Sequence, residues 1–336
     1  MKLTDFDYAI PDGLIAQYPL SDRDAARMMV VDRKTGIIRH EKFQNILNYL
    51  KPTDLMVFNH SKVVQARLIG HRQSGGRVEA FLLKDLGDGL FECLIKSTTG
   101  QKVGLEFELP GKIFAKILRK IPDTMVFEVQ FSASSEEMQK VMEVHGKVPL
   151  PPYIQREPES TDLARYQTIY AENPGSVAAP TAGLHFTPGT LQEIRNKGVE
   201  IEFVTLHVGL GTFLPIKVEN VKEHRMHFER FSIGADLSTK CAQKNNRRLI
   251  AVGTTSLRTL ESAALGMEGE TDLFIYPGFQ FRWVDVLFTN FHQPKSSLIV
   301  LLAAFLGKKE LLDEVYQTAV EEKYRFFSYG DCMLVL

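Results

Sequence analysis

The sequence is poor in cysteine and has no long hydrophobic run. Its three cysteines, Cys93, Cys241 and Cys332, lie far apart and never form a C-x-x-C pair. This spacing disfavours both a disulfide framework and a zinc ribbon. It is typical of a reducing compartment, so we expect a cytoplasmic protein. The longest apolar run covers residues 298–306. That run is too short to span a bilayer, so it predicts a buried helix.

Neither sign of charge is in excess. The 40 lysines and arginines balance 41 aspartates and glutamates, which gives a net charge of −1. Proteins that coat nucleic acid are usually basic, so the composition disfavours that class. It still allows a local basic face. The first residues carry Asp5 and Asp7 and no apolar core, so we expect neither a secretory signal nor a membrane partner.

The length of the chain and the change in its predicted secondary structure along the sequence indicate two domains. At roughly 150 residues per domain, 336 residues correspond to about two. Residues 63–131 consist of short strand-like segments separated by turns such as Pro110-Gly111, a pattern typical of a small antiparallel barrel. The rest alternates strands with helices. We therefore predict a mixed α/β fold, in which a large α/β domain (residues 1–62 and 149–336) is interrupted by an inserted β-barrel (residues 63–148).

Local signals place several elements. Ser134 and Glu137 have the spacing of a capping box and predict a helix over 135–145. Thr187-Pro188 has the residues preferred at the start of a helix. Apolar periodicity and flanking glycines predict the other elements. These are strands at 55–59, 199–208 and 248–252, a hairpin at 29–40, and helices at 256–265, 296–306 and 308–323.

Two segments combine histidine with glycine. In residues 179–186, Gly183 and His185 precede a predicted helix N-terminus, which suits an anion, and His185 can act as acid or base near neutral pH. A structural histidine in an irregular loop is the alternative. The second segment, residues 207–213, follows a predicted strand with Gly209 and Gly211. The third glycine of a dinucleotide fingerprint is missing, which disfavours a Rossmann cofactor site and the usual methyltransferase loop.

Three further segments contain residue types that suit catalysis or ligand binding. His224-x-x-His227-x-Glu229 suits acid–base work, a metal or a plain polar strand, but no H-E-x-x-H pattern or nearby cysteine supports a metal, so we expect none. Residues 253–256 combine a glycine turn with a hydroxyl-rich helix start, which suits a carboxylate or phosphate as well as simple capping. Aromatic segments beginning at Tyr276, Thr289 and Tyr324 suit either base stacking or core strands.

Taken in order, these segments resemble the S-adenosylmethionine:tRNA ribosyltransferase-isomerases, a family of queuosine biosynthesis. The matching blocks run almost end to end and include DFDYAIPDGLIAQYP, YQTIYAENPGSVAAPTAGLHFT, FVTLHVGLGTF, EHRMHFE, VGTTSLRTLESAA and EEKYRFFSYGD. Four positions depart from the family pattern. His60 replaces an acidic or amide residue and Leu210 replaces a small residue, which puts contacts to the loop around Leu210 in doubt. The changes at Leu214 and Ser297 are milder.

The resemblance implies one reaction. The ribosyl part of S-adenosylmethionine is transferred to 7-aminomethyl-7-deazaguanine in the tRNA anticodon and isomerised to epoxyqueuosine, and adenine and methionine leave. S-adenosylmethionine is then a cosubstrate, and we expect no tightly bound cofactor. The partner is tRNA, and we expect a monomer. A non-catalytic RNA-binding protein is the main alternative. A nucleoside hydrolase and a conventional methyltransferase are two others.

The reaction assigns roles to residues of the matching blocks. The acidic C5′ hydrogen beside the sulfonium needs a base, for which we predict His185, then His207 or His227. Leaving adenine needs an acid, His227 or Glu229. The carboxylate of the methionine moiety needs the 253–255 turn or Arg258, and the adenine ring can stack on Phe186, Phe213 or Tyr276. The remaining predicted substrate-binding residues are Thr181, Gly183, Gly209, Gly211, Thr212, Gly253, Thr254, Thr255, Asn290 and His292.

The tRNA partner calls for basic side chains that hold phosphates while a splayed loop base is read. The predicted contacts are Arg67, Arg225, Arg247 and Arg248. Binding is expected to weaken with salt. We expect the barrel insertion to hold part of the tRNA.

Overall fold

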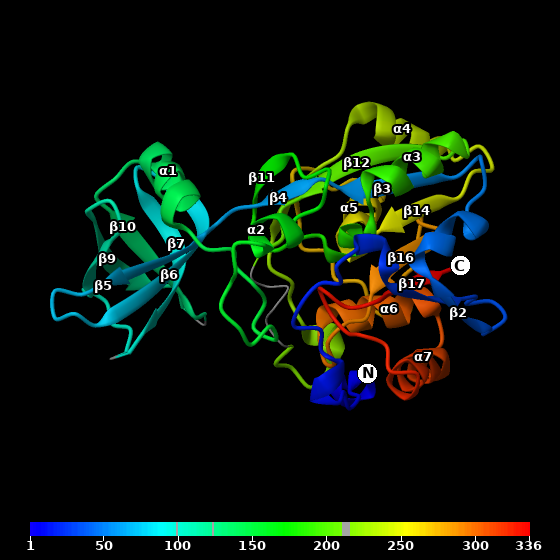
Figure 1. Ribbon diagram of the computed structural model, residues 1–336, viewed down its shortest axis with the longest axis horizontal. Helices are drawn as coiled ribbons and strands as arrows, with labels where there is room; N and C mark the ends of the chain where they lie inside the picture. The colour runs from blue at the N-terminus through cyan, green and yellow to red at the C-terminus, as the bar shows by residue number, and fades with distance from the viewer. Residues whose placement is uncertain (99, 123, 210–215) are drawn as a thin grey trace. The chain divides into compact units, whose positions relative to one another are not determined.

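The computed structural model describes residues 1–98, 100–122, 124–209 and 216–336. Their contacts divide the chain into two compact units. Residues Met1–Lys62, Pro151–Glu157 and Thr161–Leu336 form the first unit, and Val63–Leu150 and Pro158–Ser160 form the second. A large mixed sheet with helices and a closed antiparallel barrel together confirm the predicted fold class (Figure 1).

The first unit is built on a nine-stranded sheet. From one edge to the other its strands are β15 (Glu270–Thr271), β13 (Glu229–Ser232), β12 (Glu200–Leu206), β3 (Leu55–Asn59), β14 (Leu249–Val252), β16 (Val286–Asn290), β17 (Cys332–Val335), β1 (Arg27–Val31) and β2 (Ile38–Lys42). Strands β12, β3, β14 and β16 run parallel to one another. Their carboxyl ends therefore share one edge, where ligands of open α/β sheets bind.

The sheet is buried on both faces, so its central strands are apolar throughout. In β3, Leu55 and Val57 join a core that includes residues of α4 to α7, whereas Met56 and Phe58 join a core with α3 and η4. The helices are α2 (Asp162–Arg165), α3 (Pro188–Asn196), α4 (Ala235–Gln243), α5 (Thr254–Ala264), α6 (Ser297–Leu306) and α7 (Lys309–Glu321). None of the helices among the described residues is long and apolar enough for a membrane crossing.

Shorter elements connect these layers. They are the 3-10 turns η1 (Leu3–Phe6), η2 (Asp12–Leu14), η3 (Arg23–Ala25), η4 (Phe43–Tyr49), η5 (Thr181–His185) and η7 (Val221–Glu223), and a two-stranded sheet of β4 (Ser61–Val63) and β11 (Asn173–Ser176). The predicted start of α3 is confirmed, because the Thr187 hydroxyl accepts the Thr190 N–H at 3.1 Å. Helix α5 begins at Thr254, two residues before the predicted start.

The second unit is a closed barrel with strand order β10-β7-β6-β5-β8-β9. The strands are β5 (Arg67–His71), β6 (Arg77–Gly87), β7 (Leu90–Ser97), β8 (Glu106–Leu109), β9 (Ile113–Lys120) and β10 (Val126–Phe131), and α1 (Ser135–His145) follows them. The predicted capping box of α1 is present, since the Ser134 hydroxyl accepts from the Glu137 N–H and the Glu137 carboxylate accepts from the Ser134 N–H. Met138 of α1 packs into the barrel core.

The barrel closes where β5 approaches β8 at Gly70. A Cβ at Gly70 would lie 2.2 Å from the Glu108 carbonyl oxygen. We expect Gly70→Ala to lower the free energy of unfolding of the barrel by about 1–3 kcal/mol, because the strands must separate. Gly76→Ala is the matched control, since its Cβ would meet only ordinary contacts at 3.7 Å. Urea denaturation followed by circular dichroism measures both, and equal midpoints for the two variants would contradict this role for Gly70.

Candidate active site

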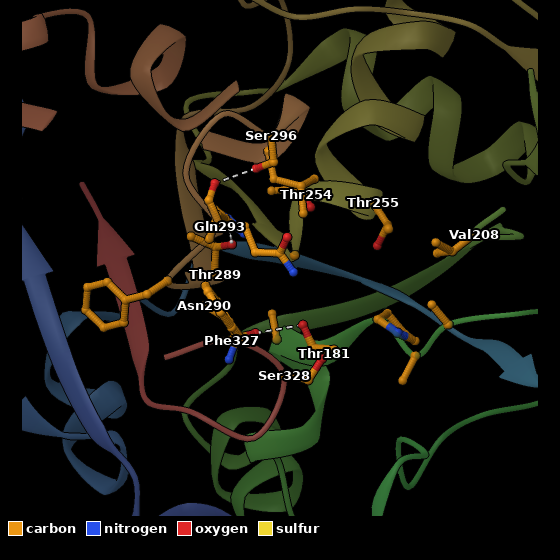
Figure 2. A pocket seen from close by; sticks show the side chains of 18 of the residues that line it. Thr181, Val208, Thr254, Thr255, Thr289, Asn290, Gln293, Ser296, Phe327 and Ser328 are labelled. Atoms are coloured by element: carbon orange, nitrogen blue, oxygen red, sulfur yellow. Dashed lines mark hydrogen bonds between the residues drawn. The ribbon is translucent and has the colours of Figure 1, made fainter. Parts of the chain in front are cut away.

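A cavity in the first unit lies at the carboxyl edge of the parallel strands (Figure 2). Val208 follows β12, Gly253 follows β14, and Asn290 ends β16. Six of the predicted substrate-binding residues line the cavity, namely Thr181, Gly253, Thr254, Thr255, Asn290 and His292. The fold therefore brings together three segments that are far apart in the sequence.

One end of the cavity is formed by the N-termini of two helices. Helix α5 starts after Gly253, which has φ +91°, and no side chain caps its first N–H groups. The Thr255 hydroxyl is buried and has no hydrogen-bond partner among the described residues. Ser296, the N-cap of α6, lines the same cavity. Free N–H groups at the start of α5 favour an anionic group.

Asn290 links the cavity to a buried histidine. Its side-chain amide lies 3.1 Å from His185 Nε2, and its oxygen accepts the Thr181 hydroxyl at 3.0 Å. The His185 ring is packed near Phe43 and Phe288, with ring centroids 5.7 and 6.0 Å away. Burial lowers the pKa of His185 to about 4, although a hydrogen bond to the Arg23 backbone opposes the shift. His185 is therefore neutral at pH 7 and reaches the cavity through Asn290.

His292 is a second neutral histidine and lines the cavity directly. Its Nε2 lies 2.9 Å from the Thr289 hydroxyl, and its backbone N–H donates to Tyr316 Oη at 3.0 Å. The Tyr8 hydroxyl donates to the His292 carbonyl. Burial lowers the pKa of His292 to about 3. Among the described lining residues, none carries a charged side chain at neutral pH.

Glu229 and Arg258 form a buried ion pair. The second Glu229 oxygen accepts the Gly209 N–H at 2.8 Å, and Arg258 Nε donates to the Leu273 carbonyl at 3.2 Å. Neither side chain is among the described residues that line the cavity. The pair therefore holds the start of the glycine segment, and the α5 turn is better placed than Arg258 to hold a ligand carboxylate.

The other predicted histidines lie outside this lining. His207 directly follows β12, and its ring packs on Gly175, where a Cβ would lie 3.1 Å from Nδ1. This Nδ1 is buried and lacks a hydrogen-bond partner among the described residues. Burial lowers the pKa of His207, and the charge of Arg230 lowers it further. His227 is exposed, and His224 packs edge-on against Phe274. No metal-binding group of three or more His, Cys, Asp or Glu occurs in the described part of the chain.

The predicted stacking rings fall in different environments. Phe186 is fully buried between Phe43 and Phe58, with centroids 4.9 Å from each, so its ring offers no surface to a ligand in this structure. Tyr276 is half-buried beside Phe274. A Cβ at Gly183 would lie 2.0 Å from Tyr170 Oη, which explains the glycine. The predicted Gly211, Thr212 and Phe213, with Leu210 and Leu214, lie outside the described residues.

Three of the four predicted tRNA-binding arginines form ion pairs within the protein. Arg67 binds Glu79 through two nitrogens, Arg248 binds Asp54 in the same way, and Arg247 contacts Glu200 at 2.6 Å. Arg225 is exposed and forms no ion pair with the described residues. His60, which departs from the family pattern, also contacts the protein itself. Its Nδ1 lies 2.7 Å from the Val204 carbonyl and its Nε2 lies 2.8 Å from the Asn173 amide.

Several lining residues were missed by the sequence reasoning. They are Tyr153, Tyr166, Gln293 and Ser296, whereas Phe327 and Ser328 lie in the aromatic segment from Tyr324 that was singled out without a role for either residue. Tyr166 and Phe327 lie in blocks that match the family, but tyrosines and phenylalanines in such blocks are equally typical of cores. No spacing signal separates the two uses.

Comparisons with known proteins give matches to the family that the sequence motifs resemble. A family model described as "Queuosine biosynthesis protein" matches residues 3–335. An S-adenosylmethionine:tRNA ribosyltransferase-isomerase of Coxiella burnetii (strain RSA 331 / Henzerling II) is 48% identical over 99% of this chain and 98% of its own length. Another from Francisella tularensis subsp. novicida (strain U112) is 44% identical over the full length of both. The crystal structure of an S-adenosylmethionine tRNA ribosyltransferase from Thermotoga maritima has 35% identity and a TM-score of 0.56, covering 99% of this chain and all of that one.

The buried histidines predict a loss of stability in mild acid. Their pKa values fall from about 6.5 in the unfolded chain to about 4 and about 3 in the fold. The unfolded state therefore binds protons first, and stability that is complete above pH 6.5 decreases as the pH falls. Each histidine contributes up to about 1.4 kcal/mol per pH unit. We expect His292→Gln to reduce this slope, measured by urea denaturation between pH 7 and pH 4.5.

The exposed His227 provides the control. His227→Gln should keep the wild-type slope, because its side chain remains in solvent in both states. A His292→Gln slope equal to that of the wild type would show that burial does not hold this imidazole neutral.

Proposed function

Because the chain belongs to the queuosine biosynthesis protein family, we propose that it catalyses the reaction of the S-adenosylmethionine:tRNA ribosyltransferase-isomerases that it resembles. It is a tRNA-modifying enzyme of queuosine synthesis, both a transferase and an isomerase. The proposed reaction transfers the ribosyl part of S-adenosylmethionine to 7-aminomethyl-7-deazaguanine in the anticodon, isomerises it to epoxyqueuosine, and releases adenine and methionine.

One observation supports this function best. The segments after β12, β14 and β16 converge on one uncharged cavity that contains the uncapped start of α5. We propose that the α5 turn holds the carboxylate of S-adenosylmethionine, since Arg258 is engaged by Glu229. A cavity whose described lining has no cationic side chain also avoids repulsion of the sulfonium.

The proton-transfer roles remain predictions. We order the candidate bases by whether their ring nitrogens already have hydrogen-bond partners. His185 has one nitrogen engaged by Asn290 and the other by the Arg23 backbone, so we propose that it positions Asn290. His207 follows β12 next to the cavity-lining Val208 and keeps Nδ1 without a described partner. We propose His207 as the base that removes the C5′ hydrogen. Glu229 is engaged as a carboxylate by Arg258 and by the Gly209 N–H, so it has no proton to donate, and of the two predicted acids we retain the exposed His227 in the proposal.

The tRNA partner and the domain roles are proposals as well. We propose that the discontinuous domain of residues 1–62 and 149–336 is catalytic and that the barrel of residues 63–148 holds part of the tRNA. Arg225 is the exposed cation among the predicted contacts. We further propose a cytoplasmic monomer that needs no tightly bound cofactor.

The reaction is tested directly by incubating the protein with S-adenosylmethionine and tRNA that carries 7-aminomethyl-7-deazaguanine. Mass spectrometry should detect adenine, methionine and epoxyqueuosine in the tRNA. Adenine without modified tRNA would indicate a hydrolase, and S-adenosylhomocysteine would indicate a methyltransferase. Salt-sensitive tRNA binding without turnover would favour a non-catalytic RNA-binding protein.

Replacing the proposed base should affect turnover more than binding. We expect His207→Gln to reduce kcat by about 10²–10⁴-fold, the usual contribution of a positioned base, with little change in the Kd for S-adenosylhomocysteine. His40→Gln, on the edge strand β2 and outside the cavity lining, is the control: it removes the His40 partner of the Tyr324 hydroxyl and should lower the unfolding temperature, but should retain wild-type kcat. Unchanged turnover in His207→Gln would exclude His207 as the base.

A further inference from the structure

A buried tyrosine in the cavity has a hydroxyl without a well-formed hydrogen bond to the described residues. Tyr166 directly follows α2, is 1% exposed and lines the cavity. Its oxygen lies near the Ser328 side chain and the Ala179 backbone. It makes no hydrogen bond of good geometry with any described residue. A buried donor left unpaired is costly, so its presence in a native site needs an explanation.

The surroundings of Tyr166 form an aromatic end of the cavity. The Tyr153 hydroxyl lies 2.6 Å from the Ser328 hydroxyl, and the Tyr153 and Phe327 ring centroids are 4.6 Å apart. Phe327 has φ +70°, a left-handed conformation that non-glycine residues rarely adopt. Such strained positions cluster at ligand sites. Tyr153, Phe327 and Ser328 all line the cavity with Tyr166.

The hydroxyls of this end are donors at neutral pH. Burial raises the pKa of Tyr166 well above its usual value and that of Tyr153 to about 12. The protonated Tyr166 hydroxyl can therefore donate a hydrogen bond to an acceptor that binds beside it. Two aromatic side chains in the lining, tilted by 50° to each other, together with such a donor suit a heterocycle that has ring nitrogens.

The two ends of the cavity differ in chemistry and are separate in space. Thr254 and Ser296 lie apart from Phe327 and Ser328 in Figure 2. The uncapped start of α5 at Thr254 suits a carboxylate, whereas the phenol end suits the heterocycle. S-adenosylmethionine carries one group of each kind at its opposite ends.

We propose that Tyr166 donates a hydrogen bond to a ring nitrogen of the adenine of S-adenosylmethionine, and that Tyr153 and Phe327 form the aromatic wall of this subsite. The proposal rests on the proposed function, which supplies the ligand. It assigns a substrate-binding role to a residue with no predicted role. The ligand then supplies the hydrogen-bond acceptor that the Tyr166 hydroxyl lacks in the free protein.

The test removes the Tyr166 oxygen and keeps the ring. Calorimetry measures the Kd of the Tyr166→Phe variant for S-adenosylhomocysteine and for 5′-methylthioadenosine, which has the adenine but no carboxylate. We expect both Kd values to rise by roughly tenfold, the effect of one lost hydrogen bond. The unfolding temperature of the free protein should stay the same or rise, since no well-formed hydrogen bond to a described residue is lost.

The control is Tyr324→Phe. Tyr324 is fully buried outside the cavity lining, and its hydroxyl is paired with His40 Nδ1 at 2.9 Å. This variant should lower the unfolding temperature and leave both Kd values unchanged. The contrast separates a ligand-binding hydroxyl from a structural one.

Other outcomes would overturn the proposal in distinguishable ways. A lower unfolding temperature with unchanged Kd values in Tyr166→Phe would make the phenol structural. A weaker affinity for S-adenosylhomocysteine alone, with 5′-methylthioadenosine unaffected, would place Tyr166 at the amino-acid end. If the wild-type protein bound neither compound and consumed no S-adenosylmethionine, the proposed function would fail together with this subsite.

Discussion

The site depends on one constraint, the parallel alignment of β12, β3, β14 and β16. Parallel strands end at the same edge of a sheet, so the residues that follow them are brought together whatever their separation in the chain. The glycine turn before α5, the end of β16 and the segment after β12 all meet there. Apolar strands buried on both faces fix this alignment, because shifting one strand by a residue would exchange its two faces between the cores.

Around this edge, polar groups are buried in an uncharged form or in pairs. His185 and His292 are neutral because burial penalises the imidazolium, and Glu229 is buried only together with Arg258. Unpaired polar atoms among the described residues are few and include Tyr166 Oη and Thr255 Oγ1. These two atoms line the cavity, and because buried polar atoms are left unpaired only at a cost, they are the atoms that the proposed ligand would pair.

Much of the fold was predictable where the determinants are local. The capping box of α1, the Thr187 cap of α3 and the continuous apolar run of β3 depend on residues within a few positions of each other. Strand β13 and helix α4 were not predicted. Gly234 precedes α4 and supplies no side-chain cap, and β13 is a four-residue strand that pairs with distant partners. Their signals arise from tertiary contacts that spacing does not show.

The sequence allowed us to predict which segments form the site, but not the role of each side chain in it. The segment around His185 does reach the cavity, but Thr181 and Ala182 line it while the imidazole turns toward Phe43 and Phe288. Arg258 is chemically suited to a carboxylate, yet Glu229, 29 residues away in sequence, engages it. Which atoms of a segment face a ligand is decided by packing across the sheet, and a single sequence does not contain that information.

The absence of charged side chains from the described lining has a physical consequence for a sulfonium ligand. In a site of low dielectric constant, a fixed cation such as a protonated His292 would repel the sulfonium much more strongly than in water. A fixed carboxylate would attract it, but would also oppose the carboxylate at the other end of the same molecule. Under the proposed function, backbone N–H groups at the start of α5 would bind that carboxylate with partial charges that are part of the helix and cannot be titrated. The low pKa of His292 and the pairing of Arg258 with Glu229 both keep full positive charge out of the cavity, as the proposed sulfonium ligand would require.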